Sequence, residues 1–131
     1  MRIALPVWGN KVSPVLDTAS RLLVVDTFDR KKVSRTETVL EELDISRRCL
    51  RIGKLNVDVL ICGAVSRAFD GLLKASGVRT LQGISGEIED VLEAFFNGNL
   101  YQSRFLMPGC RGHDMPAFAT PPDKSDTEER K

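Results

Sequence analysis

Two residues with metal-binding chemistry stand close together near the end of the chain. Cys110 and His113 lie in the glycine-containing stretch 108–114. A thiolate and an imidazole three positions apart can both reach one soft or borderline metal ion, and Gly109 and Gly112 permit the chain to wrap around it. The pair cannot complete a closed tetrahedral site alone, so an exposed thiol and a surface histidine remain an equally open interpretation.

The other cysteines stand in apolar surroundings. Cys62 is the next-to-last residue of the apolar run 57–63, and Cys49 lies on the apolar stripe of an expected helix. A buried free cysteine is more often a small core side chain than a ligand, so Cys49 is expected in the core and Cys62 is kept as a weaker candidate metal ligand. The three cysteines show no paired framework, which favours reduced thiols in a cytoplasmic protein.

Small residues gather in three further segments, 7–17, 62–67 and 82–87. Glycine lets a ligand approach the backbone, and the free N–H groups at the helix starts after Gly63 and Gly86 favour an anion. Ordinary strand-to-helix turns would show the same composition, so that interpretation stays open. The candidate cofactor-binding residues are Trp8, Gly9, Ser13, Asp17, Gly63, Ala64, Gly83 and Gly86.

The elements that must position these residues follow from hydrophobic patterning. The sequence predicts strands over 2–7, 22–28, 33–40, 57–63 and 78–81, and helices over 46–55, 67–76 and 87–97. This order predicts an α/β protein with a mixed five-stranded sheet, helices on both faces, early strands antiparallel and later strands parallel. If the first strand pairs with strand 57–63, the small-residue segments converge where ligands bind in open sheets.

Composition limits the architecture and the partners. The 131 residues, 42% of them hydrophobic, suffice for one buried core. We expect a cofactor-binding domain over 1–106, a Gly/Pro-rich segment over 107–120 and a disordered tail over 121–131. A net charge of +1 and the absence of a long apolar stretch favour neither a nucleic-acid nor a membrane partner.

Cationic residues recur along the helix expected over 46–55. Arg47, Arg48, Arg51 and Lys54 are placed away from the apolar stripe that includes Cys49. We interpret them as a solvated helix surface in preference to a nucleic-acid patch.

Several stretches together resemble a known family. Residues 1–26 contain a short strand, a glycine-containing loop and the run from Ser13 to Asp17, Ser-Pro-Val-Leu-Asp. Residues 56–100 contain a strand ending in Cys-Gly, a helix, a second strand and a helix closed by Asn-Gly. These features resemble the dinitrogenase iron-molybdenum cofactor biosynthesis family, the NifX-like proteins, and residues 105–113 are similar to the Cys-containing tails of its short members.

The resemblance implies a ribonuclease H-like fold and a non-catalytic role. That role is the binding or carriage of a metal-sulfur cluster containing iron or molybdenum, with cofactor-assembly or acceptor proteins as partners. The chain departs from the family where Gly63-Ala64-Val65-Ser66 replaces the Gly-Gly-Ile-Gly of many members, which narrows the pocket.

Two other functions are alternatives to carrying a metal-sulfur cluster. A regulatory module that binds a small anion or a protein would use the same pocket and stays open. A nuclease of the same fold needs several carboxylates converging on two magnesium ions, normally with one on the first strand. Residues 2–7 contain no acid, so the sequence disfavours the nuclease.

The tail is expected to be dispensable for folding. Residues 121–131 have no apolar periodicity and can bury almost nothing. Truncation after Thr120 is therefore expected to change the free energy of unfolding by less than about 1 kcal/mol, as measured by chemical denaturation. A clearly larger loss of stability would show that the tail docks on the domain.

Overall fold

The computed structural model describes residues 1–29, 31–101 and 105–107. The expected Gly/Pro-rich segment beyond Met107, with Cys110 and His113, and the expected tail lie outside these residues. The elements in chain order are β1 (Arg2–Trp8), β2 (Lys11–Val12), the 3-10 helix η1 (Leu16–Thr18), β3 (Arg21–Phe28), β4 (Lys31–Val39), α1 (Ile45–Lys54), β5 (Val59–Ile61), α2 (Arg67–Ala75), β6 (Arg79–Leu81) and α3 (Ile88–Asn97). None of the described helices is long and apolar enough to cross a membrane.

The strands form one mixed sheet in the order β4-β3-β1-β5-β6. The pairs β1–β3 and β3–β4 are antiparallel, whereas β1–β5 and β5–β6 are parallel, which confirms the expected change of strand direction along the sheet. The expected number of five strands is wrong, because the described residues form six. The extra strand is β2, whose two residues pair with the end of β1 around Gly9 at φ 64°, and so short a strand carries no alternation to detect.

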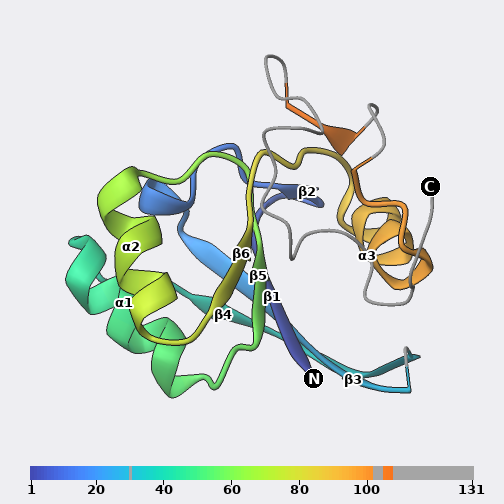
Figure 1. Ribbon diagram of the computed structural model, residues 1–131, viewed down its shortest axis with the longest axis horizontal. Helices are drawn as coiled ribbons and strands as arrows, with labels where there is room; N and C mark the ends of the chain where they lie inside the picture. The colour runs from blue at the N-terminus through green and yellow to red at the C-terminus, as the bar shows by residue number, and fades with distance from the viewer. Residues whose placement is uncertain (30, 102–104, 108–131) are drawn as a thin grey trace.

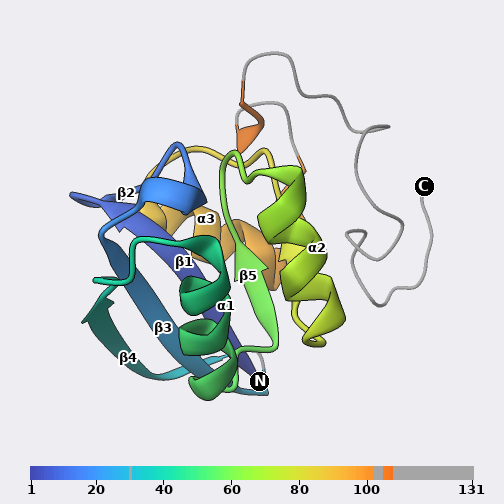
Figure 2. The same ribbon diagram turned by 90° about the vertical axis from the view of Figure 1, so that its left-hand side faces the viewer.

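Helices cover both faces of the sheet, as expected. Side chains alternate along β1, so Ile3 and Leu5 pack on the same side as Val91 of α3, while Ala4 packs with the residues of α1 and α2. Figures 1 and 2 show α1 and α2 together on one side of the sheet and α3 on the other. The α3 stripe is anchored by the buried Leu92, and the helix ends at Gly98, which has φ 77°.

One cation of α1 does not lie on a solvated surface. Arg48 is only 4% exposed, which corrects its assignment to the solvated face. Its guanidinium donates from Nε to the carbonyl of Glu42 at 2.8 Å and from Nη1 to the carbonyl of Ala19 at 2.5 Å. Arg48 is buried because a long donor-rich side chain can satisfy backbone carbonyls of the loops that pack against α1.

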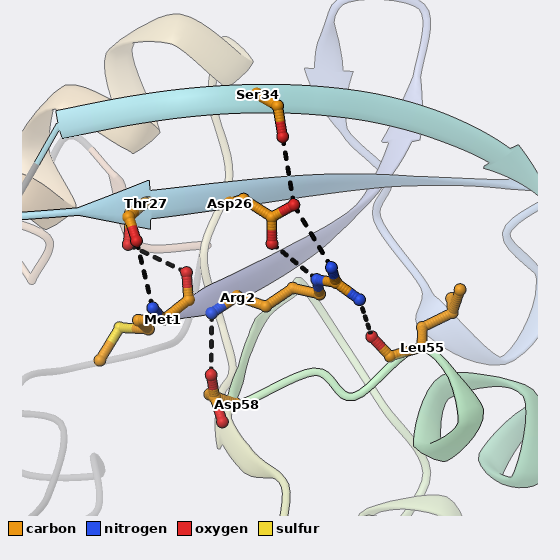
Figure 3. Close-up of polar contacts among 7 residues, drawn as sticks. All are labelled: Met1, Arg2, Asp26, Thr27, Ser34, Leu55 and Asp58. Atoms are coloured by element: carbon orange, nitrogen blue, oxygen red, sulfur yellow. Dashed lines mark hydrogen bonds and ion pairs between the residues drawn. The ribbon is translucent and has the colours of Figure 1, made fainter.

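A polar cluster joins the amino end of β1 to its neighbours (Figure 3). Arg2 Nε donates to Asp26 Oδ1 on β3 at 2.6 Å, and Arg2 Nη1 donates to the carbonyl of Leu55 at 2.6 Å. The backbone N–H of Arg2 donates to Asp58 Oδ2 at 2.8 Å, and Ser34 Oγ on β4 donates to Asp26 Oδ2 at 3.1 Å. Through these contacts one arginine links β1, β3 and the connection from α1 to β5.

The Asp26 carboxylate gives a pH-dependent test of this cluster. The hydrogen bond from Arg2 lowers the pKa of Asp26 from its ordinary value, so its stabilising effect is present at neutral pH and is lost as pH falls through that lowered pKa. Asp26→Asn is therefore expected to lower the Tm at pH 7, with the difference from the wild type shrinking in acid. Thermal unfolding across a pH series measures this, and Glu41→Gln, which removes an exposed acid outside the cluster, is the control.

Candidate functional site

The three small-residue segments, 7–17, 62–67 and 82–87, converge at the carboxyl end of the sheet. The first two are joined by a short parallel bridge between Val15 and Ala64. Ala64 N donates to the carbonyl of Pro14 at 2.7 Å, and Leu16 N donates to the carbonyl of Ala64 at 2.9 Å. The loop after β2 is thus held against the loop after β5 by the backbone itself.

Gly63 is the point of closest approach between these loops. A Cβ at this position would lie 2.6 Å from the carbonyl oxygen of Pro14 and 3.0 Å from that of Ser13, distances that no side chain tolerates without a backbone shift. The absence of a side chain at Gly63 therefore serves loop packing, and the space that the sequence assigned to a ligand is filled by residues 13 and 14.

The third segment is attached in the same way. Gly83 N donates to the carbonyl of Gly63 at 2.9 Å, and Val12 N donates to the carbonyl of Gly86 at 3.0 Å. Ile88 N at the start of α3 donates to the carbonyl of Asn10 at 2.8 Å. The turn between β1 and β2 and the start of α3 are consequently fixed relative to each other.

A fourth segment, residues 105–107, also joins the carboxyl end of the sheet. Ser85 N donates to the carbonyl of Phe105 at 2.7 Å, and Met107 N donates to the carbonyl of Gly83 at 2.8 Å. Phe105 is buried and packs in the core beneath α3. Residues 105 and 106 carry adjacent apolar side chains with no period, so their pattern predicts no element.

The helix starts at this end already have negative or polar partners. At α2, Ser66 Oγ accepts from Phe69 N at 3.2 Å, and Asp17 Oδ1 accepts from Ser66 N at 2.9 Å. The first turn of α3 carries Glu89 and Asp90. These groups complement the positive ends of the helix dipoles, and anion binding at the helix starts stays a prediction.

Cys62 is a core residue in the structure. Its side chain is fully buried, and burial together with the nearby carboxylates of Asp70 and Asp17 raises the pKa of the thiol to about 12. A protonated buried thiol is a poor metal ligand. Among the described residues no group of three or more His, Cys, Asp and Glu side chains is placed to hold a metal ion.

The remaining candidates differ in accessibility. Trp8 at the end of β1 is 72% exposed, Ala64 is exposed, and Ser13 is buried. On the α3 side of the sheet, Gly9 borders an open groove of about 310 Å³. No pattern in the sequence predicted this groove. The groove is lined by Val7, Gly9, Asn10, Leu23, Arg35, Glu37, Ile88 and Glu89.

Two ion pairs make the β4 side of the groove polar, and Arg35, Glu37 and Glu89 of these pairs line it. Arg35 Nη1 lies 2.8 Å from Glu89 Oε2, and Arg21 Nη1 lies 3.3 Å from Glu37 Oε1. The alternating polar pattern of β4 predicted an exposed strand, but it could not show that two of its charges face the start of α3.

The mixed sheet and its small-residue carboxyl end define an α/β protein whose loops meet at one end of parallel strands. The chain belongs to the dinitrogenase iron-molybdenum cofactor family, whose model matches residues 1–98. This agrees with the resemblance seen in the sequence. A search of the curated proteins found no match.

Solved structures share the fold at low sequence identity. The crystal structure of PH0822 has a TM-score of 0.71 and 19% identity, covering 75% of this chain and 90% of that one. The apo form of the orange protein from Desulfovibrio gigas has a TM-score of 0.64 and 20% identity, covering 80% and 94%. A candidate dinitrogenase from Methanocaldococcus jannaschii has a TM-score of 0.62 and 20% identity, covering 76% and 90%.

The close approach at Gly63 gives a direct test of loop packing. Gly63→Ala is expected to destabilise the protein by about 1–3 kcal/mol, because the new methyl group meets a backbone carbonyl that cannot rotate away. Gly71→Ala is the matched control, since Gly71 lies in α2 with open space around it and is expected to gain about 0.5–1 kcal/mol in helix stability. Chemical denaturation of both variants measures the difference, and equal stabilities would contradict the packing role of Gly63.

Proposed function

We propose that this protein binds and carries a metal-sulfur cluster of the iron-molybdenum cofactor type. Membership of the dinitrogenase iron-molybdenum cofactor family supports the class of cargo. The observation that carries the proposal for this chain is the attachment of Met107 to Gly83, which brings the chain to the carboxyl end of the sheet immediately before the Cys110 and His113 pair. The ribonuclease H-like fold and the single domain over 1–106 belong to the same proposal.

The length of the chain limits where the candidate ligands can lie. Cys110 is three residues beyond Met107, and three residues span at most about 10 Å. Since Met107 is held at Gly83, chain length alone keeps Cys110 within about 10 Å of a residue that is bonded to the third loop. His113 follows within a further three residues.

The described residues fit a supporting role better than a ligating one. Cys62 is fully buried, and burial raises the pKa of its thiol, so a direct bond from the protein to the cluster would come from the Cys110 thiolate and the His113 imidazole. Two protein ligands leave the other positions of the metal open to a second protein or to solvent. This arrangement suits a carrier that receives cargo from a cofactor-assembly protein and passes it to an acceptor in the cytoplasm.

The rigid backbone of the carboxyl end would then act as a platform. Its loops, which carry Trp8, Gly9 and Ala64, are fixed to one another by backbone hydrogen bonds. Preorganised loops reduce the ordering cost of binding. The negatively charged first turn of α3 would disfavour a strongly anionic cluster beside Glu89, which directs the cargo toward the Trp8 and Ala64 side.

Metal loading distinguishes ligation by the tail from binding by the loops. Wild-type protein, purified without oxygen and incubated with iron, molybdate and sulfide, is expected to retain metal and show a visible absorption spectrum. Cys110→Ser and His113→Ala are each expected to lower the metal content at least several-fold, because each removes one of two protein ligands. Circular dichroism checks that the fold is unchanged.

Cys49→Ser is the matched control, because Cys49 is a buried core thiol distant in sequence from the proposed ligands, and it is expected to keep the metal. Normal loading of the Cys110→Ser/His113→Ala double mutant would overturn ligation by the tail. Failure of the wild type to retain iron, molybdenum or sulfide would overturn carriage and favour a regulatory module instead.

A further inference from the structure

The strand β4 forms one edge of the sheet (Figure 2). Among the described strands it pairs only with β3, and a bulge near residue 33 interrupts the register between Asp26–Ser34 and Thr27–Lys32. Beyond the bulge the strand runs regularly from Ser34 to Val39, and nearly all of its side chains there are exposed. We call this regular stretch the β4 edge. No strand of the described residues pairs with its outward backbone groups, and such an edge can accept another strand.

The sequence of the β4 edge is complementary to itself about Thr36. Arg35 precedes Thr36 and Glu37 follows it, while Ser34 and Thr38 stand two positions away on either side. When two copies pair antiparallel with Thr36 opposite Thr36, each Arg35 lies opposite a Glu37. The same register places Ser34 opposite Thr38, so hydroxyl side chains also face each other.

Backbone geometry permits this register. A two-fold axis between antiparallel strands can pass through either a hydrogen-bonded or a non-hydrogen-bonded residue pair, so Thr36 can occupy the centre in either case. Residues that lie opposite each other are then both odd-numbered or both even-numbered, so their side chains point to the same face of the sheet. The pairing from Ser34 to Thr38 stops before the bulge and therefore does not require β4 to be straightened.

Neighbouring registers are disfavoured by charge. Centring the pair on Arg35 would set two guanidinium groups opposite each other, and centring it on Glu37 would set two carboxylates opposite each other. Like charges directly opposite on neighbouring strands are destabilising. The order of the charges thus selects the register about Thr36.

We propose that the β4 edge is the interface for a second copy of this chain, which pairs with it antiparallel about Thr36 and joins the two sheets into one. Existing contacts are compatible with this pairing. Arg35 donates to Glu89 from Nη1, and a guanidinium has further N–H donors. Glu37 accepts from Arg21 through Oε1 at 3.3 Å, and its carboxylate can accept from a second cation.

The expected dimer is weak and depends on concentration. Five paired residues bury less surface than the roughly 1,600 Å² of a standard stable interface. The charge pairs are partly exposed, since the Arg35 and Glu37 side chains are 38% and 44% accessible, so added salt is expected to weaken the association. Self-association is measured on protein without added metal, so its test does not depend on metal loading.

Charge reversal tests both the interface and its register. Sedimentation equilibrium of the full chain is expected to show a reversible monomer–dimer equilibrium for the wild type. Arg35→Glu and Glu37→Arg are each expected to weaken self-association about tenfold or more, because each places like charges opposite in both symmetry-related pairs. Mixing these two variants is expected to restore dimers, since every Glu of one then faces an Arg of the other.

The double mutant Arg35→Glu/Glu37→Arg is expected to dimerise alone, because exchanging the charges keeps the pattern self-complementary. Glu89→Gln is the matched control, since it removes the negative charge that faces Arg35 within the chain and leaves the residues of the β4 edge unchanged. Circular dichroism confirms folding of each variant. A wild type that stays monomeric at millimolar concentration, single variants that dimerise like the wild type, or a mixture that stays monomeric would each overturn the proposal.

Discussion

The approach of the Gly63 backbone to the carbonyls of residues 13 and 14 is the constraint on which the carboxyl end of the sheet depends. It allows the loop after β2 to run beside the loop after β5 and to exchange the two backbone hydrogen bonds that flank Ala64. Gly63 then accepts from Gly83, so the third loop is attached to the same point. A larger residue at one position would disturb all three loops, because their contacts are made by backbone and have little freedom to adjust.

The two ends of the sheet are stabilised by different chemistry. At the amino end of β1, side chains of opposite charge surround Arg2 and connect neighbouring strands, as Figure 3 shows. At the carboxyl end, backbone hydrogen bonds connect the loops to one another. The charged pairs that the structure describes near this end, Arg35 with Glu89 and Arg21 with Glu37, lie on its β4 side beside the groove that Gly9 borders.

Much of the fold could be predicted from periodicity. The α3 stripe around Leu92 and the apolar run at β5 were identified because each buries one regular pattern against the sheet. The two-residue β2 and the docking of Phe105 could not be found, since both depend on tertiary hydrogen bonds that leave no period in the sequence. Arg48 was misplaced for a related reason, because its burial depends on carbonyls brought to it from distant loops. The metal-ligating role of Cys110 and His113 stays a prediction.

The position of Trp8 has an optical consequence. It is the only tryptophan of the 131 residues, and it stands exposed at the end of β1 beside the turn that contains Gly9. Fluorescence excited where only tryptophan absorbs therefore originates wholly from the carboxyl end of the sheet, because the chain contains no second indole. Emission from this molecule reports the polarity and quenching around a single loop, while the opposite end of the sheet, around Arg2, contains no fluorophore of that kind.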